Sequence, residues 1–169
     1  MAGTIAPQTY LWTAESMGTL RRERILAGPR GEALQLGLDG RVRAGGATSH
    51  VIRARWRRCS AIYTLRDRRG ALEAVAVPMG GALGFRIAAR GLGRLKLAGR
   101  SRLGDRRLVL THGVRDVLFA DATGGLLRRP DRLESVLDFE PGFVAFIDHL
   151  ARVLRREANA AMIAIMAAG

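Results

Sequence analysis

The chain has 169 residues, of which 48% are hydrophobic, so it can bury a substantial core and is not a disordered polymer. It carries 28 Lys and Arg residues against 15 Asp and Glu residues, and the resulting net charge of +13 favours anionic partners. The single cysteine excludes an intramolecular disulfide, and no signal peptide or stretch long enough to span a membrane is visible. We therefore expect a cytoplasmic protein that reaches a membrane only peripherally, at its inner face.

Residues 1–17 are predicted to form an N-terminal arm, and residues 18–169 a single β-rich domain that ends in a helix. From residue 18 to about residue 130, short alternations of apolar and polar residues recur at intervals of roughly ten residues, each closed by a turn signal. A period of two places one face of each segment in the core and the other face in water. This spacing is typical of a meandering antiparallel sheet.

The segment 51–57 shows the alternation clearly, because Ile52, Ala54 and Trp56 alternate with arginines. The next segment, residues 62–66, runs into residues 67–70, whose sequence Asp-Arg-Arg-Gly predicts a tight turn. An aspartate opens such a turn by accepting hydrogen bonds from the backbone ahead of it, and a glycine closes it by adopting a positive φ. Comparable turns are predicted at residues 28–31 and 121–124.

A change of period predicts a C-terminal helix over about residues 142–168, with Pro141 in its first turn. Residues 158–168 are apolar on nearly every side, and a helix of that kind must be surrounded by other groups. We expect either an antiparallel β-barrel that encloses these residues or a strongly curved open sheet whose helix is covered by a partner subunit, and we favour the barrel. In the barrel, truncation after Glu157 is predicted to give an insoluble product. The first half of the helix carries one apolar stripe, made of Phe143, Phe146, Ile147, Leu150 and Leu154.

Three segments carry a resemblance to a known family: residues 63–70 and 117–124, each ending in an Asp-x-x-Gly turn, and the slim apolar run 160–168. This pattern resembles the tubby-like superfamily, which includes the phospholipid scramblases and the LURP-one-related proteins. The resemblance implies a twelve-strand barrel around a buried helix and an affinity for phosphoinositides or other acidic lipids. The cysteine-rich stretch and the acidic Ca²⁺-binding loop of the scramblases are missing here, so the resemblance carries over the fold and no functional residue.

The sharpest functional feature is a row of arginines on the segment 51–57. On a strand, alternate side chains stand about 7 Å apart on one face, so the row can contact several phosphates at once. The alternative is an ordinary solvated face of an exposed sheet. Together with nearby basic residues on the turns, the predicted anion-binding residues are Arg53, Arg55, Arg57, Arg58, Arg66, Arg68 and Arg69.

Signals for catalysis are poor. His50, His112 and His149 are isolated in the sequence, without metal-ligand spacing to one another or to Cys59. No catalytic residue, metal site or cofactor is predicted. We expect a non-enzymatic module that binds anionic phospholipid headgroups. The alternatives are a module that binds the backbone of nucleic acids and a structural subunit that forms homo- or hetero-oligomers through its C-terminal helix.

Overall fold

A computed structural model describes residues 8–17, 23–57, 60–79, 84–99, 107–121 and 130–168 of the chain. The described residues form twelve strands and one helix. In chain order these are β1 (Tyr10–Met17), β2 (Glu23–Ala27), β3 (Ala33–Leu36), β4 (Arg41–Ala44), β5 (Ala47–Arg57), β6 (Ser60–Asp67), β7 (Leu72–Pro78), β8 (Gly84–Ala89), β9 (Gly93–Gly99), β10 (Arg107–His112), β11 (Arg115–Asp121), β12 (Asp131–Ser135) and α1 (Pro141–Ala168).

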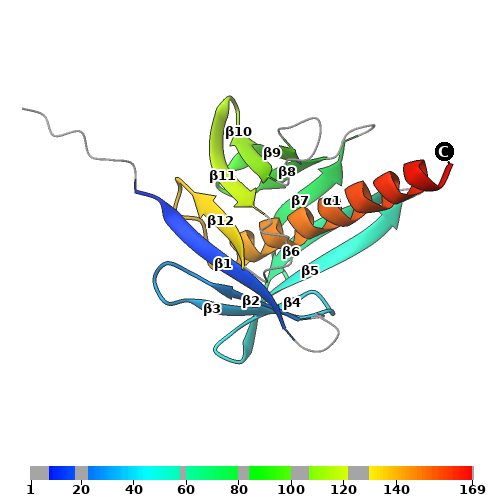
Figure 1. The fold of residues 1–169 in the computed structure, drawn as a ribbon. Coiled ribbons are helices and arrows are strands. Elements are labelled where there is room, and N and C mark those ends of the chain that lie inside the picture. The colour runs from blue at the N-terminus through cyan, green and yellow to red at the C-terminus, as the bar shows by residue number, and fades with distance from the viewer. Residues whose placement is uncertain are drawn as a thin grey trace, which may run out of the picture.

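The strands form a closed antiparallel barrel in which each strand pairs with its neighbours in the chain and β1 pairs with β12 (Figure 1). The expected barrel around a partly buried helix is therefore confirmed. Residues 10–17, which were predicted to belong to an arm, instead form β1 and pair on both sides, with Ala14 opposite Leu26 and Asp131. Their alternation buries Trp12 and Ala14, and this burial holds the segment in the barrel wall.

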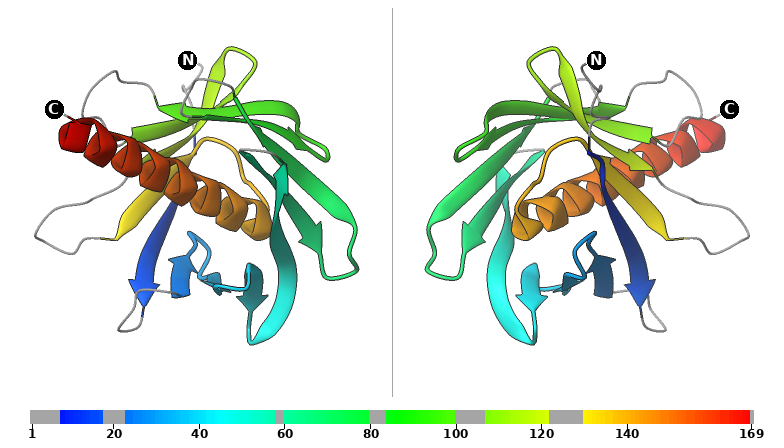
Figure 2. Two further views of the ribbon diagram at one scale, coloured as in Figure 1. Left: turned by 90° about the vertical axis from the view of Figure 1, so that its right-hand side faces the viewer. Right: turned by 90° about the vertical axis from the view of Figure 1, so that its left-hand side faces the viewer.

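Because consecutive strands alternate in direction, their ends gather at two rims of the barrel. We call the rim where α1 begins the proximal rim; it consists of residues 28–32, 45–46, 68–71, 90–92, 113–114 and 136–140. We call the opposite rim the distal rim; it consists of the strand ends at Met17, Leu36, Arg57, Pro78, Gly99 and Asp121. Figure 2 shows the helix crossing the interior obliquely from one rim to the other.

The turn at residues 67–70 forms as the sequence predicts. Asp67 Oδ1 accepts hydrogen bonds from the backbone N–H groups of Arg69 and Ala71, both at 2.8 Å. Gly70 has a φ of +83°, in the left-handed region that favours glycine. The turn gives β6 and β7 their antiparallel pairing, and it projects from the proximal rim.

The core lies between the inner face of the barrel and the first half of α1. The predicted apolar stripe of the helix is buried, from Phe143 to Leu154. The inward-facing side chains of the strands, which recur every two residues, pack against the apolar stripe of the helix, which recurs about every 3.6 residues. Together they form one core. The largest fully buried side chains are Phe85, Phe146, Leu26, Leu36, Leu65, Ile87, Leu97, Leu110, Leu118, Leu133, Ile147 and Leu150.

The prediction that residues 158–168 lie inside the barrel is wrong. Leu154 is the last buried residue among the described side chains of α1. Of the side chains that the structure describes beyond Arg155, Ala158 is half-buried and the others are exposed. Ile163 is 62% exposed, and Figure 1 shows the last turns of the helix extending past the strands. The bore is filled by phenylalanine, leucine and isoleucine side chains, and a run of alanines would leave empty space there.

A buried ion pair between α1 and the barrel wall sets how far the helix is inserted into the barrel. Arg24 of β2 is 3% exposed and Asp148 of α1 is 1% exposed. They form a bidentate contact, with Arg24 Nε at 2.6 Å from Asp148 Oδ2 and Arg24 Nη2 at 2.8 Å from Asp148 Oδ1. Arg24 Nη2 also lies 2.5 Å from Asp131 Oδ2 of β12. A shift of the helix by one turn would leave buried charges unpaired, so these contacts set its register.

Candidate functional site

The predicted anion-binding arginines of β5 lie on the outer surface of the barrel. Ile52 is buried in the core, and Arg53 and Arg55 are exposed on the opposite face of the same strand. Arg57 ends β5, but its side chain lies outside the described part of the structure, as does the whole of Arg58. Arg53 and Arg55, the two members of the predicted arginine row whose side chains are described, therefore lie on the outer face as predicted.

The remaining predicted arginines belong to the neighbouring strand and its turn. Arg66 lies on β6 opposite Val51, and its Nη1 donates a hydrogen bond to the carbonyl oxygen of Gly70 at 2.7 Å. Arg68 and Arg69 are exposed on the turn that follows. The β5–β6 hairpin therefore carries a basic surface that runs toward the proximal rim, which we call the arginine stripe: Arg53, Arg55, Arg66, Arg68 and Arg69.

The arginines differ in whether acidic side chains neutralise them. Arg24, Arg30 and Arg107 form ion pairs with Asp148, Asp138 and Asp121 respectively. Within the described residues, Arg53 and Arg55 form no ion pair. The charge on β5 is therefore available to an external anion, whereas much of the charge around β1, β2 and β12 is used inside the molecule.

The distal rim combines this charge with exposed apolar groups. Trp56, at the end of β5, is 73% exposed, and Ile163 on the projecting part of α1 is 62% exposed. Met17 and Val77, near the ends of β1 and β7, are also exposed. Exposed apolar side chains also occur at the proximal rim, among them Val114 and Leu137, so the distal rim is distinguished by an exposed tryptophan together with the projecting end of α1. No described helix has the length and apolar character that crossing a membrane requires.

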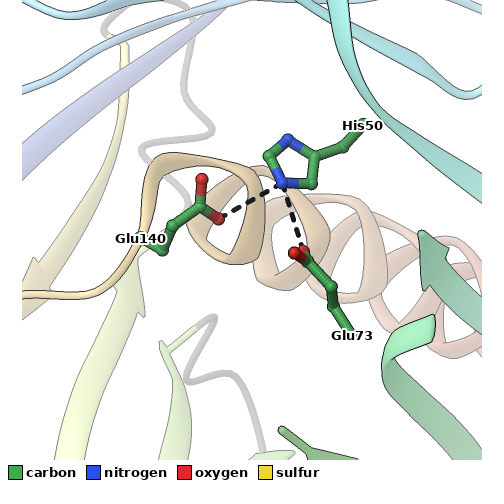
Figure 3. Close-up of side chains that lie close together, drawn as sticks. All are labelled: His50, Glu73 and Glu140. Carbon is green, nitrogen blue, oxygen red and sulfur yellow. Dashed lines mark ion pairs between the residues drawn. The ribbon is translucent and has the colours of Figure 1, made fainter. Parts of the chain in front are cut away.

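A second cluster of chemically active side chains lies at the proximal rim (Figure 3). His50 of β5 is 7% exposed, and its Nε2 lies 3.1 Å from Glu73 Oε2 of β7 and 3.5 Å from Glu140 Oε2. Glu140 directly precedes α1, and its Oε2 also accepts the backbone N–H of Phe143 at 3.3 Å. A Cβ on residue 142 would lie 2.4 Å from His50 Nδ1, so Gly142 makes room for the imidazole ring.

Several clefts open beside this cluster, and two of them are lined by Glu140. A cleft of about 370 Å³ is lined by Glu73, Glu140, Arg90 and Phe143, together with other residues of the proximal rim. A second cleft, of about 310 Å³, is lined by His50, Glu140 and Gly142 among others. Solvent can therefore approach the two carboxylates, although the imidazole ring itself is buried.

Sequence reasoning missed the cluster because it treated His50 as an isolated residue. The three side chains come from β5, β7 and the start of α1, so no local spacing connects them. The other two histidines behave differently. His112 is exposed on β10, whereas His149 packs on the ring of Tyr63 with centroids 5.6 Å apart. Burial lowers the pKa of His149 from 6.5 to about 4, and the charge of Arg152 adds to this shift.

Comparison with protein-family models, with curated proteins and with solved structures gives no match for this chain.

Proposed function

We propose that the protein binds the surface of anionic phospholipid membranes peripherally, with the distal rim directed toward the bilayer. One observation carries the proposal: an apolar helix end leaves a basic barrel at the same rim as an exposed tryptophan. The lipid affinity implied by the tubby-like resemblance points in the same direction. The apolar and the basic groups of this rim would together form one binding surface.

The apolar part consists of Trp56 and the projecting residues of α1. Tryptophan is favoured at the headgroup level of bilayers because its ring is apolar while its indole N–H is polar. The projecting segment from Arg156 to Ala168 would span roughly 20 Å at 1.5 Å per residue. Its exposed alanines and Ile163 face water in the isolated protein, and burial in the acyl boundary would remove this apolar surface from water.

The basic part consists of Arg156 on the projecting helix, Arg55 two residues before the end of β5, and Arg53 farther along the same outer face of that strand. All three are exposed, and the two on β5 form no ion pair within the described chain. Basic residues near an anionic bilayer contribute about 1 kcal/mol each, and this attraction decays within a Debye length. Stable peripheral binding usually needs both an apolar and an electrostatic contribution, and the distal rim offers both.

Vesicle binding followed by tryptophan fluorescence tests the proposal. The chain has two tryptophans: Trp12 is 3% exposed, and Trp56 is 73% exposed. Vesicles of phosphatidylcholine with phosphatidylglycerol should shift the emission to shorter wavelength, because the Trp56 ring leaves water. Vesicles of phosphatidylcholine alone should not produce this shift, and Trp56→Phe should abolish it. About 1 M salt should weaken binding strongly, because the Debye length falls to roughly 3 Å.

A matched pair of double variants separates binding through the β5 arginines from attraction by the net charge of the protein. Arg53→Gln/Arg55→Gln should weaken binding to the acidic vesicles by roughly tenfold or more. Arg94→Gln/Lys96→Gln removes the same charge from β9, where both residues are exposed, and should have a smaller effect. Equal binding to neutral and acidic vesicles at low salt would overturn the proposal. Tighter binding to duplex DNA than to acidic vesicles, or a stable oligomer that buries Trp56, would also count against it.

A further inference from the structure

We infer that His50, Glu73 and Glu140 form a binding site for a divalent transition-metal ion at the proximal rim. The inference is independent of membrane binding, because the cluster lies at the opposite end of the barrel from Trp56 and Ile163.

The hydrogen bonds of Ser49 determine the tautomer of His50. The Ser49 hydroxyl donates its proton to the carbonyl oxygen of Val42 at 3.1 Å. A hydroxyl has one proton, so the same oxygen accepts from His50 Nδ1 at 3.1 Å. The proton of the neutral ring therefore lies on Nδ1. Figure 3 shows that Nε2, which then carries a lone pair, faces the two carboxylates. Three electron-rich atoms facing one another require a cation between them.

A metal ion satisfies this requirement better than a proton. A second proton on the ring would sit on Nε2, where it can donate one well-aligned hydrogen bond and so serves one carboxylate. Metal-bound histidines commonly donate their other ring N–H to a neighbouring oxygen, which is the role that Ser49 fills here. The backbone N–H of Phe143 orients the Glu140 carboxylate in the same way.

The spacing of the ligand atoms fits a small ion. Zinc bonds to histidine nitrogen and to carboxylate oxygen are about 2.0–2.2 Å long, which separates two tetrahedral ligands by about 3.3–3.6 Å. The two distances from His50 Nε2 to the carboxylate oxygens are 3.1 and 3.5 Å, and all three ligand atoms lie within 4.8 Å of one another. A small movement of Glu73 or Glu140, both of which line the open cleft, would complete the arrangement.

The ligand set also indicates which ions the site prefers. An imidazole nitrogen with two carboxylates suits zinc, manganese or iron, whereas magnesium and calcium prefer oxygen ligands. Two carboxylates neutralise a divalent charge and offset the partial positive charge at the start of α1. Glu73 and Glu140 line the same cleft as Arg90, so water or a small anion can reach an ion held by these carboxylates from that cleft.

Zinc titration of the tag-free protein tests the site. The titration uses the variant Cys59→Ser, because the only thiol of the chain could otherwise bind the metal. Calorimetry at neutral pH should show one zinc ion per chain, and zinc should raise the midpoint of thermal unfolding where magnesium does not. Cobalt should bind in place of zinc and give visible absorption bands that report a nitrogen ligand.

Substitutions assign the binding to these side chains. His50→Gln and Glu73→Gln should each weaken zinc binding by at least tenfold. His112→Gln and Glu134→Gln change exposed residues outside the cluster and should leave the affinity within about twofold. If His50→Gln does not fold, the half-exposed Glu73 and the exposed Glu140 carry the test. No stoichiometric zinc binding by the Cys59→Ser protein, or an affinity that Glu73→Gln and Glu140→Gln leave unchanged, would overturn the inference.

Discussion

The two halves of α1 have similar apolar content but opposite environments. From Phe143 to Leu154 the helix packs inside the barrel, although this half contains the charged residues Asp148 and Arg152. From Arg156 onward it projects beyond the distal rim, and this half also contains two charged residues, Arg156 and Glu157. Apolar content by itself therefore does not decide which half of the helix is buried.

This difference shows that volume and pairing decide which half enters the bore. Large side chains such as Phe146 fill the interior to close packing, which alanines cannot do. The charge of Asp148 is accommodated because Arg24 projects inward from β2 and forms two hydrogen bonds with it. A charged residue with a matching partner in the wall is therefore compatible with burial, and it fixes the position of the helix.

The largest effect is expected when the buried pair is broken. Asp148→Ala would leave Arg24 buried without its main partner and should lower the free energy of unfolding by about 3–5 kcal/mol. Urea denaturation measures this loss. The double variant Arg24→Met/Asp148→Leu removes both charges and should recover most of the stability, while Asp131 retains Arg155 at 3.6 Å. A loss below about 1 kcal/mol for Asp148→Ala would show that the pair does not hold the helix.

Truncated side chains in the two halves should sharpen the contrast. Leu150→Ala opens a cavity in the bore and should cost about 2–5 kcal/mol. Ile163→Ala removes atoms that already face water and should change the free energy of unfolding by less than about 0.5 kcal/mol. Comparable losses for the two variants would mean that the projecting half packs against something in the isolated protein.

The buried half should also make stability depend on pH through His149. Because the pKa of His149 is lowered from 6.5 to about 4 in the folded protein, the unfolded chain takes up its proton first as the pH falls. Stability from this group is complete above pH 6.5 and declines as the pH falls toward about 4, with a total loss of roughly 3 kcal/mol.

Urea unfolding of the wild type and of His149→Gln between neutral pH and pH 4 isolates this contribution. The variant should lose less stability over the range, because glutamine does not take up a proton. Carboxylates titrate in both proteins and cancel in the comparison. Identical pH dependences would show that His149 is not buried in a neutral form.

The smallest effect on stability is expected from removal of the exposed half. Truncation after Glu157 deletes residues whose described side chains, apart from the half-buried Ala158, are exposed, and it should change the free energy of unfolding by less than about 1 kcal/mol. The product should be soluble and melt cooperatively, contrary to the expectation from sequence. It should also lose most of its affinity for acidic vesicles. An insoluble product would show that the end of the helix is needed for the fold.

The sequence by itself determined the local structure of this protein. The period of two in the strands, the Asp67–Gly70 turn and the change of period before Pro141 are properties of neighbouring residues, and the structure agrees with them. The alternation of Ile52 with Arg53 likewise placed the arginines on the outer face. Such features depend on backbone geometry, which sets the face of the strand or helix on which each side chain lies. The pattern of residues within one segment is enough to predict them.

Only the tertiary structure decided which part of the helix is buried and which side chains meet at the proximal rim. Apolar periodicity describes how strongly a segment prefers burial, but it does not give the width of the bore or the inward charge of Arg24. His50, Glu73 and Glu140 come together because barrel closure aligns β5, β7 and the start of α1. Contacts between distant segments depend on that closure, and no pattern within one segment records it.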